Sequence, residues 1–214
     1  MKSKIIEMFR MQNSLNHTTA GAYWERRSDV VFENAIIAET AELLESLGYK
    51  WWKDHAVDID NAMVEVVDLW HFVMSFVMQK RQGRFSYDEL TEPFANAFAT
   101  ATTNIPTNDY LLNAVCYQFV GNVCNYNGNI SQLADSFAKV VCGIGLTFDE
   151  LYTMYIVKNA LNKLRQDRGY TDGTYRKDWN GVEDNVVTMQ IGKGLTFDEC
   201  YAKLAEYYDT YIAS

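Results

Sequence analysis

Apolar residues recur at the three- and four-residue spacing of helices along most of this 214-residue chain. Short runs that alternate apolar and polar residues, which would indicate strands, are scarce. Only two prolines are present to interrupt helices, and no stretch rich in Pro, Gly or Ser marks a linker. The pattern predicts an all-α fold, a helical bundle, in a single domain that spans residues 1–214.

Local signals predict the ends of two helices near the N-terminus. Asp29 can cap the first of them, and Gly48 can end it. Asp60 can cap the second, which should end in the polar segment 79–84. These two helices follow each other directly, so we expect them to pack side by side in opposite directions.

Further helix starts are marked by capping boxes, in which a Ser or Thr is followed three residues later by Glu. These pairs are Ser86 with Glu89, Thr147 with Glu150, and Thr196 with Glu199. Two more helices are expected over 107–124 and 130–142. The segment 169–187 is rich in Gly, Asp, Asn and aromatic residues, and we expect an ordered loop that carries functional residues.

The charge balance limits the kinds of partner. Lys and Arg number 19 and Asp and Glu number 28, so the net charge is −9. This acidity argues against binding in a duplex nucleic-acid groove and against a polybasic membrane surface. Segment 93–134 has Asp109 as its only charge, but its Asn and Gln residues make it unsuitable as a membrane span.

The opening segment and the cysteines indicate a compartment. The opening residues MKSKIIEMFRMQ carry charges throughout, so they do not resemble a signal peptide. The four cysteines include no C-x-x-C pair, which is typical of reduced thiols in a cytosolic protein. We therefore expect a cytoplasmic location.

Two pairs of acidic residues stand three positions apart on successive helices. Glu39 and Glu42 form one pair, and Glu65 and Asp68 form the other, which lies among bulky apolar neighbours. Carboxylates in such surroundings are costly unless they are paired or bind a metal. Two antiparallel helices would bring both pairs into a four-carboxylate cage, and hard oxygen ligands of this kind suit Mg²⁺. The alternative is two solvated helix faces.

A di-iron carboxylate bundle uses similar parts, with a Glu-x-x-His motif from each of two helices. Asp68 and His71 imitate one such motif. The other histidines, His17 and His55, lie in no such motif, so the second half cannot be built. His71 is therefore either a metal ligand or a residue that hydrogen-bonds behind the ligands.

Basic and amide residues form one stripe near the C-terminus. Lys158, Asn162 and Arg165 fall at i, i+4 and i+7, and Tyr170 and Lys177 follow beyond the helix. Arg offers phosphate a bidentate fork and Lys a point charge, so the stripe is typical of an anion clamp, although it could be an ordinary solvated face. A metal cage and an anion clamp in one acidic chain together indicate a polyphosphate substrate.

Four segments give the chain a family resemblance. They are Gln12-Asn13-Ser14-Leu15-Asn16, AETAELLESLGYKWWK over 38–53, EVVDLWHF over 65–72, and KNALNKLRQDRGYTDGTYRKDWNGVEDN over 158–185. In these segments the chain resembles the dimeric all-α deoxyuridine triphosphatases of the all-α nucleoside triphosphate pyrophosphatase superfamily. The resemblance implies that fold type, with a variable helical insert at approximately 85–145.

The resemblance also implies roles for individual residues. Glu39, Glu42, Glu65 and Asp68 match the family's ligands for two or three Mg²⁺ ions, and Glu39 and Glu42 are both candidates for the general base. The residues that match contacts to the substrate's base, sugar and phosphates are Gln12, Asn16, Trp52, Lys53, Phe72, Lys158, Asn162, Arg165, Tyr170, Lys177 and Asn185. For Trp52 and Phe72, packing in the core is an equal alternative.

The implied activity is Mg²⁺-dependent hydrolysis of dUTP to dUMP and diphosphate, which limits uracil in DNA and supplies dUMP. A homodimer, without duplex nucleic acid or a membrane as partner, and a phage or bacterial origin are also implied; a phage protein would act in the host cytoplasm. Alternatives are a pyrophosphatase that also splits dCTP or another dNTP, because an amide side chain can serve either pyrimidine, and a helical interaction module with solvated carboxylates.

Overall fold

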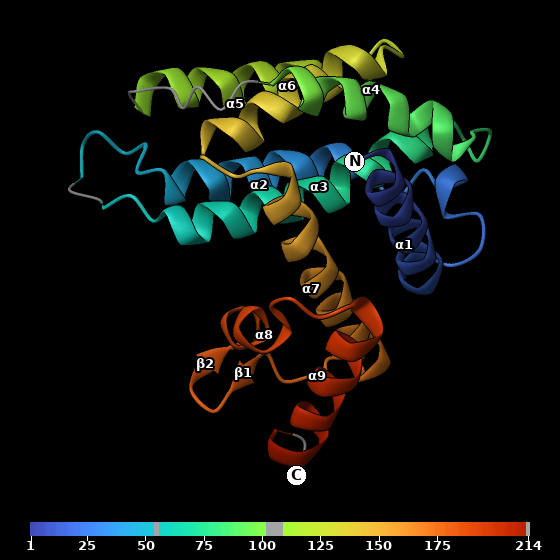
Figure 1. Cartoon of the computed structure of the whole chain (residues 1–214), viewed down its shortest axis with the longest axis vertical. Coiled ribbons are helices and arrows are strands. Elements are labelled where there is room, and N and C mark those ends of the chain that lie inside the picture. The colour runs from blue at the N-terminus through green and yellow to red at the C-terminus, as the bar shows by residue number, and fades with distance from the viewer. Residues whose placement is uncertain (54–55, 102–108, 213–214) are drawn as a thin grey trace.

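The computed structural model describes residues 1–53, 56–101 and 109–212, and it confirms the predicted all-α fold (Figure 1). The helices are α1 (Lys2–Ala20), α2 (Phe32–Ser46), α3 (Ile59–Lys80), α4 (Tyr87–Thr100), α5 (Asp109–Cys124), α6 (Ile130–Gly143), α7 (Phe148–Asp167), α8 (Asp184–Gly192) and α9 (Phe197–Tyr211). A short 3₁₀ helix, η1 (Trp24–Arg26), follows α1. Two short strands, β1 (Asp178–Trp179) and β2 (Val182–Glu183), form an antiparallel hairpin before α8.

Helices α2 and α3 pack against each other more extensively than any other pair, and they run in opposite directions as expected (Figure 1). Two hydrogen bonds join the end of α2 to the start of α3. The Asp58 N–H donates to the Ser46 carbonyl (2.8 Å), and the Asn61 amide donates to the Ser46 hydroxyl (2.7 Å). This antiparallel pairing is what places the two acidic pairs opposite each other.

Helices α4, α5 and α6 cover α2 and α3 from above in Figure 1, and Trp70 is the centre of the shared core. Its indole stacks on Phe137, with ring centroids 5.2 Å apart, and meets Phe9, Phe94 and Phe98 with its edges and face. Much of the nearly uncharged segment 93–134 therefore supplies core side chains, because Phe94, Phe98, Leu112, Phe119 and Leu133 are buried here.

A second, smaller hydrophobic cluster lies around α8 and α9. Val157, Leu161 and Leu164 of α7 pack there against Trp179 and Leu204. The N-terminal half of α7 belongs instead to the larger core, through residues such as Tyr155. Helix α7 is thus shared between the two clusters and connects them (Figure 1).

The capping boxes were predicted correctly. Ser86, Thr147 and Thr196 each accept a hydrogen bond from the backbone N–H of the Glu three residues on, and each Glu side chain bonds back. Gly48 also ends α2 as expected. It adopts a φ of 69°, and the N–H groups of Gly48 and Tyr49 close a Schellman motif on α2.

Two predicted N-caps were wrong. Asp29 pairs with the Arg27 guanidinium instead, and α2 begins without a side-chain cap. Helix α3 is capped by Asp58, which accepts from the Asn61 N–H (3.0 Å), so Asp60 falls in its first turn. For α2, the Arg27 guanidinium competes for the Asp29 carboxylate. For α3, Asp58 offers the same carboxylate as Asp60 two residues earlier.

Three other boundaries differ from or match the predictions. The expected loop 169–187 contains the β1–β2 hairpin and ends inside α8, so it is more regular than predicted. The expected helix 130–142 is α6. The helix expected over 107–124 is α5 from residue 109, and its first predicted residues lie outside the described part of the chain.

Helix α3 is long and apolar enough to cross a membrane by length and composition alone. However, 72% of that apolar window is buried inside the protein, as in the core helix of a globular bundle. The four cysteines form no disulfide, and three of them are buried while Cys124 is exposed.

Candidate active site

A cleft of about 1510 Å³ lies between the two clusters and gathers side chains from α1, α2, α3, α7, α8 and the segment around the hairpin. All four predicted metal ligands line it, as do all the predicted substrate contacts except Trp52 and Lys53. Residues more than 100 positions apart in the sequence therefore meet in one site, as the acidic and basic patterns together predicted.

Three carboxylates converge on one wall of the cleft. Glu39 and Glu42 come from one face of α2, and Glu65 comes from the facing side of α3. One oxygen from each lies within 4.8 Å of the others, an arrangement that could hold a metal ion. The Asn61 amide donates to Glu65 Oε1 (2.9 Å) and so fixes that carboxylate's orientation.

The electrostatics of this group fit a divalent cation. Burial, followed by the negative charges of Asp68, Glu42 and Glu65, raises the pKa of Glu39 to about 8. Burial and the charges of Asp68 and Glu42 likewise raise the pKa of Glu65. The positive charge of Lys158 lowers both pKa values but does not offset the increase, and a bound Mg²⁺ ion would relieve the remaining repulsion.

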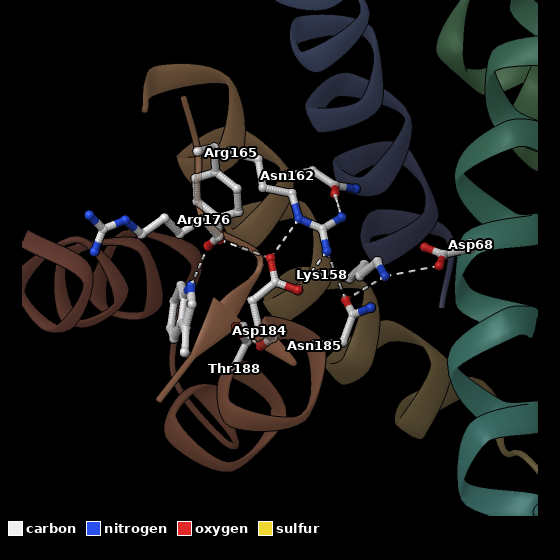
Figure 2. A network of polar contacts seen from close by, with 10 residues as sticks. Asp68, Lys158, Asn162, Arg165, Arg176, Asp184, Asn185 and Thr188 are labelled. Atoms are coloured by element: carbon white, nitrogen blue, oxygen red, sulfur yellow. Dashed lines mark hydrogen bonds and ion pairs between the residues drawn. The ribbon is translucent and has the colours of Figure 1, made fainter. Parts of the chain in front are cut away.

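The fourth predicted ligand, Asp68, lies in the same cleft but is not one of the three converging carboxylates. Its Oδ2 atom forms an ion pair with Lys158 Nζ (2.9 Å). Lys158 is only 2% exposed, and it also donates to Asn185 Oδ1 (2.7 Å). Figure 2 shows this lysine between Asp68 of α3 and Asn185 of α8, so it joins the carboxylate wall to the basic wall.

Arg165 is held by a residue that the sequence analysis missed. Asp184 accepts from Arg165 Nε (2.9 Å) and from Arg165 Nη2 (2.7 Å; Figure 2). It also accepts from the Tyr175 hydroxyl (2.9 Å). Burial lowers the pKa of Arg165, but the hydrogen bonds and charge of Asp184 more than offset this and raise it. The guanidinium is therefore a permanent cation in a fixed orientation.

The rest of the basic wall follows the predicted stripe. Asn162 Oδ1 accepts from Arg165 Nη1 (3.3 Å), and the Tyr170 ring lies between two cations. Arg165 is 5.7 Å and Lys177 is 5.2 Å from the centroid of that ring. Lys163, on another face of α7, bonds Asp167 and does not line the cleft.

Amide side chains line the other end of the cleft. Gln12 and Asn16 of α1 are buried and both bond the Ser75 hydroxyl, and Gln12 Nε2 also donates to Asn16 Oδ1 (3.0 Å). Tyr155 donates its hydroxyl to Gln12 Oε1 (3.2 Å). Phe72 is half-buried at this end, where it both lines the cleft and packs against the larger core.

Two predicted contacts lie elsewhere. Trp52 is 60% exposed and Lys53 is exposed, both in the turn after α2, and neither lines the cleft. The adjacent Trp51 is 89% exposed. The alternative that Trp52 fills the core is wrong.

His71 has no place in a di-iron site here. Its Nδ1 atom donates to the Val67 carbonyl (2.8 Å), and its ring packs on Tyr155 with centroids 4.4 Å apart. Burial lowers the pKa of His71 to about 4, so the ring is neutral. In the described part of the chain, the converging group consists of carboxylates without histidine, so it does not match the Glu-x-x-His pattern.

Three polar residues that position the site were missed: Asn61, Ser75 and Asp184. Asn61 and Ser75 lie one helical turn from Glu65 and His71, so an i−4 or i+4 search from each candidate would have found them. Asp184 precedes the predicted Asn185, but nothing in the local pattern distinguishes it from the other acidic residues of the segment.

The comparison with known families agrees with this geometry. The family dUTPase_2, described as dUTPase, matches residues 4–170, which is more than half of the chain. No curated protein matches the chain closely enough to count as a relative. The match includes the three converging carboxylates and Arg165, whereas the hairpin, α8 and α9 follow it. The non-enzymatic alternative is therefore set aside: the chain belongs to the dUTPase family and is a dUTP diphosphatase, a hydrolase.

Proposed function

We propose that this chain hydrolyses dUTP to dUMP and diphosphate with two or three Mg²⁺ ions held by Glu39, Glu42, Glu65 and Asp68. The observation that carries this proposal is the juxtaposition, in one cleft, of converging carboxylates and a buried basic wall. Bound Mg²⁺ would supply positive charge to the phosphate oxygens and to the attacking water. Asp68 would join the other three ligands by giving up its ion pair with Lys158.

The basic wall would bind the triphosphate. Lys158, Arg165 and Lys177 would stabilise the negative charge that develops on the phosphates, and Asn162 and Tyr170 would add hydrogen bonds. The burial of Lys158 and Arg165 supports this role, because charges act more strongly on a ligand when water is excluded. We assign proton acceptance from the attacking water to Glu39 or Glu42, because Glu65, the third member of the converging group, already accepts a hydrogen bond from Asn61.

The amide end of the cleft would bind the nucleoside. We assign the base to Gln12, Asn16 and Phe72, and the sugar to Asn185, which lines the cleft and accepts a hydrogen bond from Lys158. Uracil offers an N3 donor and an O4 acceptor, whereas cytosine offers the reverse, and an amide can serve both. dCTP and other dNTPs therefore remain to be compared as second substrates.

We also propose the wider setting that the resemblance implies. The protein would act in the cytoplasm, limiting uracil in DNA and supplying dUMP, as one domain that forms a homodimer. Exposed aromatic side chains support the homodimer, since Trp51 and Trp52 lie on the surface of the single chain. In a dimer, Trp52 and Lys53 could reach a site that they do not reach within one chain.

Diphosphate release from dUTP, with and without Mg²⁺, tests the proposed reaction, and dCTP, dTTP, dATP and dGTP give the specificity. Glu65→Gln removes one converging carboxylate while leaving its size unchanged, so we expect Mg²⁺-dependent turnover to be lost. Glu206→Gln, on the exposed face of α9, is the matched control and should behave as wild type. Near wild-type turnover by Glu65→Gln, or release only from dATP or dGTP, would refute the assignment.

A further inference from the structure

The segment that follows the family match places one acidic residue directly behind the basic wall. Asp184 lies in the first turn of α8 and is only 1% exposed. It accepts both hydrogen bonds of a bidentate pair with Arg165 and a third from the Tyr175 hydroxyl. A buried carboxylate with three donors in these directions is held rigidly.

The remaining hydrogen-bond donors of Arg165 show what this rigidity achieves. A guanidinium has five N–H donors. Nε and Nη2 bond Asp184, Nη2 also reaches Asn185 Oδ1 (3.4 Å), and Nη1 reaches Asn162 Oδ1 (3.3 Å). Among the contacts that the structure describes, one Nη1–H remains without a protein acceptor, on a side chain that lines the cleft.

Asp184 itself does not line the cleft, so it touches Arg165 rather than the space for substrate. We propose that Asp184 is a positioning residue for the reaction: it orients the Arg165 guanidinium so that its unpaired N–H faces the phosphates. This inference rests on the role proposed above for Arg165. It also gives the C-terminal segment, which lies beyond the family match, a defined part in the site.

The chain offers a matched control for this role. Asp209 of α9 forms the same kind of bidentate pair with Arg168, at the end of α7 (2.7 and 2.6 Å), but neither residue lines the cleft. Both pairs attach the C-terminal segment to α7. Asp184 and Asp209 therefore share the attachment, but the Asp184 pair is buried and its arginine lines the cleft, whereas the Asp209 pair is more exposed and lies outside it.

The test compares Asp184→Asn with Asp209→Asn in steady-state hydrolysis of dUTP. Asp184→Asn should lower kcat by about ten- to a hundredfold, with KM changed less than about threefold, because the misoriented cation is felt mainly in the transition state. Asp209→Asn should leave both constants unchanged. In an Arg165→Lys background, Asp184→Asn should have no further effect on kcat, because it acts through Arg165.

The alternative, a purely structural role, predicts different results. It would be supported, and the proposal overturned, if Asp184→Asn multiplied its effect with Arg165→Lys, or if kcat stayed within about twofold of wild type. If Asp184→Asn does not fold, Tyr175→Phe can be used instead, because it removes one of the three hydrogen bonds to Asp184. This variant should lower kcat by a smaller factor and leave KM unchanged. An unchanged kcat would count against the proposal. Wild-type-like kcat in Arg165→Lys would instead show that the role of Arg165 is wrong.

Discussion

The raised pKa of Glu39 means that the carboxylate group carries a proton near neutral pH, and this proton makes metal binding depend on pH. The pKa of Glu39 is raised to about 8, first by burial and then by its acidic neighbours. A cation that binds there must displace the proton, so the apparent Mg²⁺ affinity should fall about tenfold per pH unit below pH 8. It should be roughly constant above that pH, and at pH 7 about 0.9 proton should leave for each ion bound at Glu39.

Isothermal titration calorimetry measures this proton directly. Mg²⁺ is titrated at pH 7 in two buffers that differ in ionisation enthalpy, and the difference in observed heat gives the number of protons released. Repeating the titration from pH 6 to pH 9 gives the change in affinity. Because the four carboxylates interact, the proton belongs to the group, and the titration reports that group rather than Glu39 alone. Specific Mg²⁺ binding with no proton release at pH 7 would refute the reasoning.

The same proton sets the sign of a stability effect. The folded pKa of Glu39 lies above its ordinary value of 4.5, so the metal-free protein loses stability as pH rises from about 4.5 to about 8. In Glu39→Gln the side chain is neutral at every pH and does not titrate. The thermal midpoint of this variant, relative to that of wild type, should therefore rise as pH increases from about 4.5 to about 8. Saturating Mg²⁺ should remove most of the difference, because the ion replaces the proton.

Two further predictions concern packing. A Cβ atom on Gly192 would lie 2.7 Å from Cys200 Sγ and 2.9 Å from Val157, so Gly192→Ala should cost about 1–3 kcal/mol in urea unfolding. The control is Gly121→Ala in α5, where nothing lies within 4 Å and the helix should gain up to about 1 kcal/mol; equal effects would contradict this account. Trp70→Ala should cost about 3–5 kcal/mol, because a fully buried indole leaves a cavity among Phe9, Phe94 and Phe137. Less than about 1 kcal/mol would show that the core collapses around it.

Local chemistry explains why much of the fold could be predicted. Capping boxes such as Thr147 with Glu150 depend on residues only three positions apart, so the sequence contains the complete interaction. The pairing of Glu39 with Glu42 follows equally from helical geometry. By contrast, the cap of α3 was misplaced by two residues, because Asp58 and Asp60 offer the same carboxylate and only the path of the preceding chain decides between them.

Contacts between distant segments explain what could not be predicted. The ion pair of Asp68 with Lys158 joins residues 90 positions apart, so local spacing could not predict that Asp68 is paired with a lysine while the other three carboxylates converge. The place of Asp184 behind Arg165 depends on how α8 returns against α7. The exposure of Trp52 reflects the turn after α2, where composition alone suggests a buried side chain.

The boundary between the two hydrophobic clusters falls inside helix α7, between Ile156 and Val157, and not in a loop. Backbone hydrogen bonds of α7 cross this boundary. The amides near the boundary therefore stay hydrogen-bonded for as long as either cluster remains folded. Amide hydrogens in the middle of α7 should then exchange with deuterium later than those of α8 or α9. The helix that carries Lys158 would thus be the last part of the site to open.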